Sequence, residues 1–295
     1  MPIKNLVISG GGAIGFQYFG ICKHLLESNF FQMENIKNIY CTSAGSFIAV
    51  TLLLNYDLQT IQDYLVDRPW HELFKFSPFK ILNSFQTKGL FGSYHICEFL
   101  RPLLLGKNLE IDITLKQFYE FSKTTIHFNC VEFSNEEAVK KVTITHENFP
   151  DLKLSEAIQM TSCIPLLIEP IFMDNKFLLD GGIITNYNSE ECLSVNCEDD
   201  CFGLNYRVNR EKDETFKLSD DMNIFNFFYI YNFKMNQFIH KNCPDCDLKN
   251  QILVNLDESP LSSSLLQDIF SKKEVRKKWI QNGIDDAKKY LESSI

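Results

Sequence analysis

The chain has 295 residues, of which 45% are hydrophobic and 23% charged, and 29 basic against 38 acidic residues give a formal net charge of −9. This composition is typical of a globular protein and excludes a disordered or fibrous chain. Nucleic-acid binding is disfavoured, because neither half of the chain has an excess of basic residues to offer a phosphate backbone. The ten cysteines are too few for a disulfide scaffold.

The N-terminal segment, MPIKNLVISGGG, lacks the long apolar core of a signal peptide. The longest apolar runs, such as residues 47–54, are far shorter than the roughly 20 residues that a membrane-spanning helix needs. We therefore expect a cytoplasmic protein with reduced thiols and no transmembrane segment. Peripheral contact with a membrane is left open by this reasoning.

The first elements in chain order alternate between strand and helix. Residues 3–8 and 36–42 are short apolar runs rich in β-branched residues, which predicts two strands. Residues 13–27 and 44–54 carry apolar side chains at helical spacing. The order strand, turn, helix, strand, turn, helix predicts an α/β fold with a central, mostly parallel sheet flanked by helices.

The rest of the chain is also predicted to contain both helices and strands. Further helices are predicted over residues 58–66, 94–105, 115–122, 154–162, 224–239 and 272–291. Further strands are predicted over residues 125–133, 138–145, 167–173, 176–179, 201–207 and 251–256. We interpret residues 68–92, with scattered Pro, Gly and aromatic residues, as an irregular loop or cap, and residues 207–221 as a mobile charged insertion. No linker divides the chain, so one domain over residues 1–295 is expected.

A glycine-rich turn, GGGAIG at residues 10–15, follows the first strand and opens the first helix. The spacing matches a dinucleotide-binding fingerprint, but the second strand ends in YCTS, without the acidic residue that would hold a ribose. The turn could instead present backbone N–H groups at a helix N-terminus to a developing oxyanion. A purely structural turn that needs positive φ is the plain alternative.

A serine occupies the equivalent turn after the second strand, in the run Cys41-Thr42-Ser43-Ala44-Gly45. An apolar strand, a serine flanked by small residues and an apolar helix are the context of a nucleophile elbow, G-x-S-x-G. Cys41 stands in place of the first glycine. The alternative is that Ser43 only caps the helix.

An aspartate ends a later apolar strand, in the run LLDGG at residues 178–182. A serine nucleophile needs a base, and Asp180 is a candidate. The alternative is an ordinary Asp-Gly turn. Three features thus occur in one order along the chain: a glycine turn, a serine elbow and an Asp-Gly-Gly sequence.

This order resembles the patatin-like phospholipase family, whose motifs are G-G-G-x-[RK]-G, G-x-S-x-G and D-G-[GA]. The resemblance extends to KGLF at residues 88–91, to AIQMTSCIP at 157–165, and to Asn186. It covers about residues 3–188, and residues 189–295 are expected to complete a patatin-like three-layer fold.

The resemblance implies a lipid acyl hydrolase, an esterase of the phospholipase A type, that acts on phospholipids or other acyl-ester lipids. Ser43 would be the nucleophile and Asp180 the other half of a Ser–Asp dyad that works through an acyl-enzyme, with no metal and no cofactor. The implied oxyanion hole lies in the glycine turn of Gly10, Gly11, Gly12 and Gly15. The elbow would be built by Cys41, Ala44 and Gly45, and the Asp-Gly-Gly motif completed by Gly181 and Gly182.

Three residues depart from the family pattern: Ile14 replaces its Arg or Lys, Cys41 its elbow glycine, and Asn188 its Pro. A free Asp is a weak base near neutral pH, so we expect burial to raise the pKa of Asp180. The departures keep open a catalytically weak lipid-binding protein that retains the fold, and an acyltransferase is a close variant.

Other side chains suggest rival sites. His240 is the only histidine that follows Asp180, so a Ser-Asp-His triad is conceivable. Cys243 and Cys246, with cysteines 192, 197 and 201, suggest structural zinc as an alternative to free thiols. Aromatic residues on the helix predicted over 224–239 suggest either a core or an acyl channel. The basic residues of 272–278 form either a solvated face or a membrane-docking patch.

Overall fold

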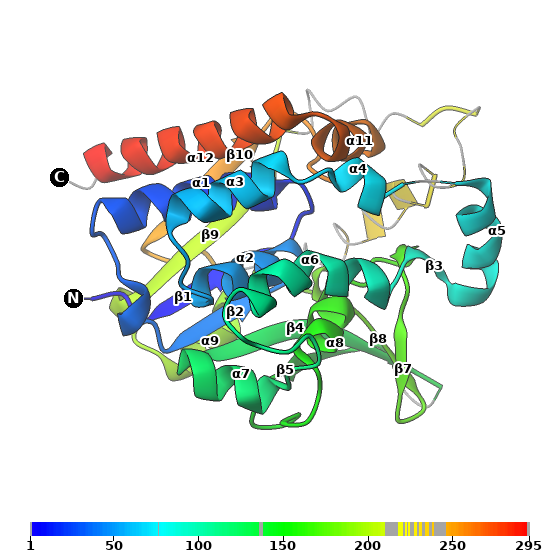
Figure 1. Cartoon of the computed structure of the whole chain (residues 1–295), viewed down its shortest axis with the longest axis horizontal. Helices are drawn as coiled ribbons and strands as arrows, with labels where there is room; N and C mark the ends of the chain where they lie inside the picture. Colours follow the sequence, from blue (N-terminus) through cyan, green and yellow to red (C-terminus); the bar gives the residue numbers. More distant parts are fainter. Residues whose placement is uncertain are drawn as a thin grey trace.

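The computed structural model describes residues 2–75, 77–135, 138–209, 218–220 and 246–293, with single residues and pairs between 222 and 238. Within this part of the chain, the central sheet has eight strands along the order β10-β9-β1-β2-β4-β8-β7, with β5 pairing β4. The five strands from β10 to β4 are parallel, and β5, β8 and β7 are antiparallel additions. The predicted mostly parallel sheet is confirmed (Figure 1).

The strands are three to ten residues long. Their bounds are β1 Asn5–Ile8, β2 Asn38–Cys41, β3 Gly89–Phe91, β4 Thr125–Ser134, β5 Lys140–Ile144, β6 Leu166–Ile168, β7 Ile171–Met173, β8 Lys176–Asp180, β9 Cys201–Val208 and β10 Gln251–Leu256. Strands β3 and β6 form a separate parallel pair.

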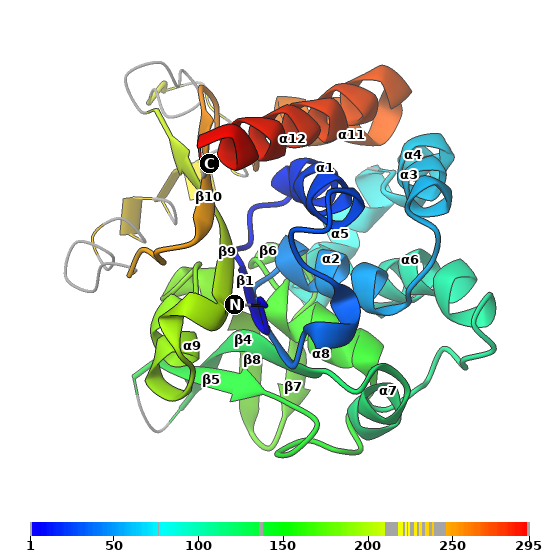
Figure 2. The ribbon, with the colours of Figure 1, turned by 90° about the vertical axis from the view of Figure 1, so that its left-hand side faces the viewer.

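The helices cover the sheet unequally. Their bounds are α1 Ile14–Glu27, α2 Ala44–Leu53, α3 Leu58–Asp67, α4 Trp70–Leu73, α5 Pro78–Thr87, α6 Ser93–Leu105, α7 Leu115–Ser122, α8 Leu154–Thr161, α9 Ser189–Val195, α11 Ser263–Ser271 and α12 Lys273–Ser293. Figure 2 shows α1, α2 and α8 on one face of the sheet and α9 on the other. The flanking by helices that the sequence predicted is therefore confirmed. Among the described residues, no helix is long and apolar enough to cross a membrane.

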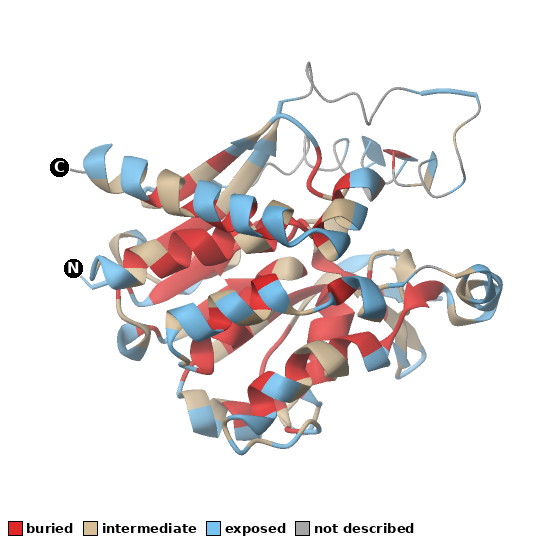
Figure 3. Ribbon diagram, turned by 45° about the horizontal axis from the view of Figure 1, so that its top comes forward, coloured by how far each residue is buried: buried red, intermediate tan, exposed pale blue. Residues whose placement is uncertain are grey.

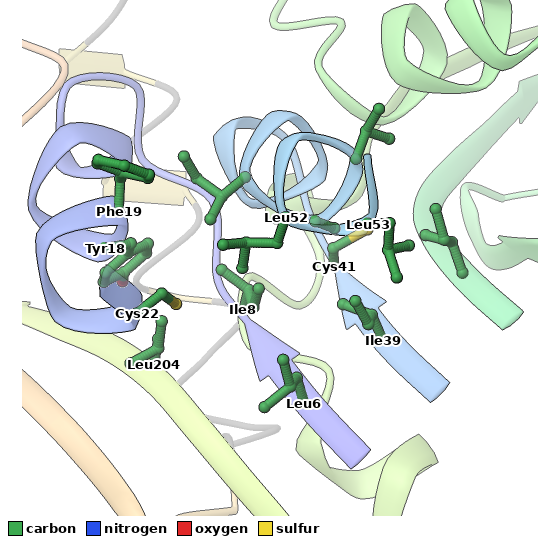
Figure 4. Close-up of a cluster of buried hydrophobic side chains, with 14 of the residues drawn as sticks. Leu6, Ile8, Tyr18, Phe19, Cys22, Ile39, Cys41, Leu52, Leu53 and Leu204 are labelled. Carbon is green, nitrogen blue, oxygen red and sulfur yellow. The ribbon is translucent and has the colours of Figure 1, made fainter. Parts of the chain in front are cut away.

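Successive side chains along a strand point to opposite faces of the sheet, and both faces are packed with apolar residues. Leu6 and Ile8 of β1 belong to the large core beneath α1 and α2, which Figure 4 shows in close-up. Val7 and Tyr40 point the other way, into a smaller cluster with Cys192 of α9. Strands buried on both faces are expected of a parallel sheet, and they fix the register of β1 against β2.

Helix α12 closes the fold by lying along α1. A Cβ atom placed on Gly20 of α1 would come within 2.1 Å of the Ile280 carbonyl oxygen, and one on Gly283 of α12 within 2.0 Å of the Gln17 oxygen. Because these glycines carry no side chain, the two helix backbones approach closely. The C-terminal helix thereby packs on the helix that follows the glycine turn.

Several sequence predictions are corrected. Residues 68–92 are not irregular: they form α4, α5 and β3. The single strand predicted over residues 167–173 is two strands, β6 and β7, that pair with different partners. Helices α9 and α11 were not predicted. The charged insertion over residues 207–221 and the aromatic helix over 224–239 lie largely outside the described residues.

Candidate active site

Ser43 sits in a sharp turn between β2 and α2, with φ 50° and ψ −122°. This left-handed backbone region costs a non-glycine residue energy and is kept where the surrounding structure enforces it. Enforcement comes from close packing: a Cβ on Gly45 would lie 2.5 Å from the Ile8 carbonyl oxygen. The Ser46 hydroxyl donates to the Ser43 carbonyl oxygen at 2.6 Å. A sharp turn of this kind between a strand and a helix is the backbone geometry that a nucleophile elbow needs.

The alternative that Ser43 is only a helix cap is wrong. Its side chain makes no capping hydrogen bond to α2. Instead, the Ser43 hydroxyl lies close enough to the carboxylate of Asp180 to lower the pKa of that carboxyl. Only 7% of Ser43 and 4% of Asp180 is exposed, so this contact is nearly sealed from water.

Sheet register explains how a residue 137 positions later reaches the serine. β2 pairs β4 with Cys41 opposite Phe128, and β8 runs back along β4 with Asp180 opposite Cys130. Cys130 lies two residues beyond Phe128, as Ser43 lies two residues beyond Cys41. The antiparallel strand β8 therefore ends at the level of the serine turn, on the edge where the parallel strands finish.

Burial sets the proton affinity of Asp180. It raises the pKa of this carboxyl from 3.8 to about 6, because the buried charge loses its hydration. The hydrogen bond from the Gly182 N–H, at 2.7 Å, and the nearby Ser43 hydroxyl act in the opposite direction and lower it. The expected upward shift is thus confirmed in direction, and desolvation is its main cause.

The glycine turn lies against the serine. A Cβ on Gly10 would come within 2.8 Å of both the Ser43 Cβ and the Asn186 Oδ1. The Gly10 N–H donates to Asn186 Oδ1 at 3.1 Å. Gly11 and Gly12 have φ of 136° and 56°, which glycine adopts freely. In the described part of the chain, no hydrogen bond engages the N–H groups of Gly11 and Gly12.

Two helix N-termini meet at this point. Helix α1 begins at Ile14, directly after the glycine turn, and α2 begins at Ala44, directly after the serine. Neither first turn carries an acidic side chain. A Cβ on Gly15 would meet the Ala44 Cβ at 3.7 Å, an ordinary contact, so the helix ends lie side by side. Their partial positive charges favour negative charge at the serine.

The three residues that depart from the family pattern are buried in the interior of the protein. Ile14 and Cys41 are both fully buried, and Figure 4 shows Cys41 at the end of β2 among apolar side chains. Asn188 is buried too, and its amide donates to Glu191 at 2.9 Å. None of the three contributes a charge to the site.

The residues that hold the Ser43 backbone in place were not identified from the sequence. The Ser43 N–H donates to the Thr161 carbonyl oxygen at 3.1 Å and to its hydroxyl at 3.2 Å. That hydroxyl donates to the Asn129 carbonyl oxygen at 2.6 Å, and the Asn129 amide donates to the Thr42 hydroxyl at 3.2 Å. Thr161 belongs to the small-residue block at 157–165, which was the available signal.

Tyr206 was also missed. It lies on β9 two residues past Leu204, which pairs with Ile8 of β1, so it reaches the level of the glycine turn. A Cβ on Gly11 would lie 2.7 Å from its ring. Burial raises the pKa of the Tyr206 hydroxyl, and the negative charge of Asp180 raises it further. The sequence gives no local signal for this contact, because it depends on the order of strands in the sheet.

Two alternative sites were considered from the sequence, a Ser-Asp-His triad and a structural zinc site. His240 and Cys243 lie outside the described residues. Among the described residues, no group of three or more His, Cys, Asp or Glu side chains is arranged to hold a metal ion. The Sγ atoms of Cys192 and Cys201 lie 3.4 Å apart, and Cys246 lies near Glu190.

The structure buries one residue of the basic cluster on the closing helix and leaves its lysines exposed. Arg276 is buried and donates to the Val66 carbonyl oxygen at 2.6 Å. Salt bridges join Lys272 to Asp268, Lys273 to Asp67 and Lys277 to Glu274. Most of these positive charges are therefore already neutralised within the chain.

The α/β fold thus brings together a serine with positive φ at a strand-to-helix turn, a buried carboxyl group beside it and a glycine turn. The patatin-like phospholipase family model matches residues 6–193. The chain belongs to this family.

Relatives of known sequence and structure agree with this assignment. The chain is 27% identical over 192 residues to the probable lipid hydrolase 463L of Invertebrate iridescent virus 6, and 25% identical over 186 residues to protein R571 of Acanthamoeba polyphaga mimivirus. These matches span 62% and 63% of this chain, but only 61% and 60% of the relatives. VipD from Legionella pneumophila shares the fold, with a TM-score of 0.57 at 13% identity over 99% of this chain and 67% of VipD.

Proposed function

We propose that the chain is a lipid acyl hydrolase that cleaves carboxylic ester bonds with a Ser43–Asp180 dyad. The observation that carries the proposal is that the Ser43 hydroxyl, at a turn with positive φ, lies beside the buried Asp180 carboxyl at the same level of the sheet. Family membership supports a lipid ester as the substrate, and one relative carries the name probable lipid hydrolase. Phospholipids and other acyl-ester lipids are the substrate class we propose.

Acylation begins when the Ser43 Oγ attacks the carbonyl carbon of the ester. The hydroxyl proton passes to the Asp180 carboxylate as the bond forms. Negative charge then develops on the former carbonyl oxygen. We assign its stabilisation to the N–H groups of Gly11 and Gly12 and to the N-terminus of α1, because the Gly10 N–H is engaged by Asn186.

Collapse of this intermediate breaks the bond to the alcohol, which leaves with the proton held by Asp180. A water molecule then attacks the acyl-enzyme while Asp180 takes its proton, and the fatty acid is released as the Ser43 hydroxyl re-forms. A carboxyl with a pKa of about 6 serves both steps, since it is ionised near neutral pH yet basic enough to accept a proton. No other titratable group is required by this sequence of steps.

The test compares the wild-type chain with Ser43→Ala and Asp180→Asn on a short-chain p-nitrophenyl ester and on a fluorescent phospholipid. Ser194→Ala and Asp174→Asn, at exposed positions outside the site, are matched controls. We expect both site variants to lose at least about a thousandfold in kcat/KM, and both controls to retain activity.

Two results would point to the alternatives. Turnover that is absent in the folded wild type, with retained binding of phospholipid, would make the chain a lipid-binding protein. Dyad-dependent acyl transfer to an added alcohol that outpaces hydrolysis would make it an acyltransferase with the same acyl-enzyme.

A further inference from the structure

Helix α5 directs polar side chains toward the rest of the molecule and apolar side chains toward solvent. The side chains directed at the rest of the molecule are polar: Lys80, Ser84 and Thr87 are the partly buried positions, spaced at i, i+4 and i+7. The apolar side chains lie on the opposite face. Phe79 is 77% exposed and Phe85 83% exposed. A helix of a water-soluble domain ordinarily buries its apolar face against the core.

The exposed face is mostly apolar along the length of the helix, with Asn83 and Gln86 as its polar members. Its large side chains are Phe79, Ile81, Leu82 and Phe85. Figure 3 shows α5 exposed around most of its circumference, set apart from the buried centre. The helix is nonetheless well formed, because the Ser77 hydroxyl caps it through the Lys80 N–H at 3.2 Å and Pro78 occupies its first turn.

Charge around α5 is opposite in sign to that of the chain. Residues 73–97 contain three lysines and no acidic residue, in a chain with a net charge of −9. Lys75 and Lys88 are exposed at the two ends of the helix. By contrast, Lys272, Lys273 and Lys277 at the start of the closing helix are each paired with an acid. An apolar stripe flanked by lysines matches the interfacial zone of an anionic lipid layer.

A third exposed aromatic residue, Phe172, lies near the C-terminal end of α5. The Lys88 Nζ lies 5.7 Å from the ring centroid of Phe177, and that ring lies 4.8 Å from the ring of Phe172. Phe172, on the β7–β8 hairpin, is 60% exposed. Figure 1 places α5 at the end of the molecule opposite the N-terminus, the end toward which β1 runs. Helix α5 therefore lies toward the end of the molecule at which the parallel strands β1 and β2 terminate.

Helix α5 is also joined to the site through short connections. It leads directly into β3, which pairs with β6, and the Leu166 N–H donates to the Lys88 carbonyl oxygen at 3.2 Å. Five residues before Leu166, Thr161 holds the Ser43 backbone. A surface that anchors α5 would thus be positioned relative to the dyad by two strands and one helix.

We propose that the exposed face of α5, with Phe79, Leu82 and Phe85 as its anchors, inserts into the interfacial region of an anionic lipid membrane. The three apolar side chains enter the boundary between headgroups and acyl chains, and Lys75 and Lys88 lie at the level of the lipid phosphates. This inference deepens the proposed function and rests on it for its purpose, since docking would bring the substrate layer to the edge of the sheet that holds Ser43.

The experiment measures binding without turnover. The full chain carrying Ser43→Ala is sedimented with vesicles of phosphatidylcholine alone and of phosphatidylcholine with about 30 mol% phosphatidylserine. We expect binding to the anionic vesicles. Adding Phe79→Ala, Leu82→Ala and Phe85→Ala should weaken it by at least about tenfold, because three exposed apolar side chains are removed. Adding Lys75→Gln and Lys88→Gln should weaken it by roughly tenfold at low salt, and less at high salt.

Controls separate docking from folding and from catalysis. Leu105→Ala with Val195→Ala removes exposed apolar side chains elsewhere and should leave binding unchanged. In a chain with Ser43 intact, the triple alanine variant should hydrolyse a water-soluble short-chain ester like the wild type. A Phe79→Trp variant supplies a direct signal: its emission should shift to the blue with anionic vesicles, whereas Trp70 and Trp279 are buried.

Three results would overturn the proposal. The first is a Ser43→Ala chain that does not bind either vesicle. The second is a triple alanine variant that binds as tightly as its parent. The third is a chain that forms a dimer which the triple variant dissociates, without vesicle binding, since the face would then belong to a second copy. None of these results would contradict the proposed hydrolase activity, because hydrolysis of the water-soluble ester tests that activity separately.

Discussion

Replacing Asp180 with Asn should stabilise the fold at neutral pH while abolishing turnover. The carboxylate is buried, and its pKa is raised from 3.8 to about 6. A group whose pKa is higher in the folded state stabilises the fold when protonated. That stabilisation is complete below about pH 3.8 and is lost as the pH rises through about 6. Above pH 6 the wild type therefore holds a charge at a cost that Asn does not incur.

The magnitude follows from the two pKa values. The difference between 3.8 and about 6 corresponds to about 3 kcal/mol. Between about pH 4 and pH 7.5, the stability of Asp180→Asn relative to wild type should improve by about 2 to 3 kcal/mol. All other titrating groups are common to the two proteins, so their contributions cancel. Asn also retains an acceptor for the Gly182 N–H, which Asp180 binds at 2.7 Å.

Urea denaturation of both proteins at several pH values measures this difference, provided that the m-value is the same. Asp174→Asn, at the exposed β7–β8 turn, is the matched control and should show no such trend. A relative stability of Asp180→Asn that stays constant across this pH range would refute the reasoning, because it would mean that the carboxylate is not held at a desolvation cost.

Three further predictions concern activity and packing. The pH profile of kcat/KM should rise toward a plateau with a midpoint near 6, because Asp180 must be ionised to act as a base; a flat profile between about pH 4 and 8 would contradict this role. Gly10→Ala should lower kcat/KM by at least about a hundredfold, since its Cβ would lie 2.8 Å from the Ser43 Cβ, and retained activity would show that the turn can move. Gly20→Ala should destabilise the fold by about 2 kcal/mol or more in urea denaturation, because its Cβ would lie 2.1 Å from a carbonyl oxygen of α12. Gly15→Ala, on the same helix with a nearest contact of 3.7 Å, should be neutral or stabilising, and equal effects would disprove the packing argument.

Local sequence was enough to predict the parts of the site that depend on short-range geometry. Glycines at residues 10–12 and the small residues after Ser43 are required by tight turns between a strand and a helix, whatever lies elsewhere in the fold. The structure indeed has positive φ at Gly11, Gly12 and Ser43. Asp180 could be proposed because it ends an apolar strand, and the family resemblance linked it to the serine.

Contacts that depend on strand order could not be predicted in this way. Tyr206 reaches the glycine turn only because β9 lies beside β1, and Thr161 reaches Ser43 only because α8 packs over β4. Nothing near Tyr206 in the sequence reports its neighbour strand.

The prediction for residues 68–92 was wrong for a different reason. Its prolines and glycines suggested a loop, but Pro78 begins a helix and Gly89 begins a strand. The apolar spacing of α5 is helical, yet it faces away from the core. A pattern that predicts an element does not specify what the element's apolar face will contact.

The central claim is that Ser43 is a nucleophile activated by Asp180. Its most direct measurement is labelling of the folded chain with a fluorophosphonate, which transfers its phosphonyl group to an activated serine with loss of fluoride. Peptide mapping by mass spectrometry then locates the adduct. We predict a single adduct on Ser43, absent from Ser43→Ala and strongly slowed in Asp180→Asn. An adduct on another serine, or labelling of Ser43 at the same rate without Asp180, would contradict the account.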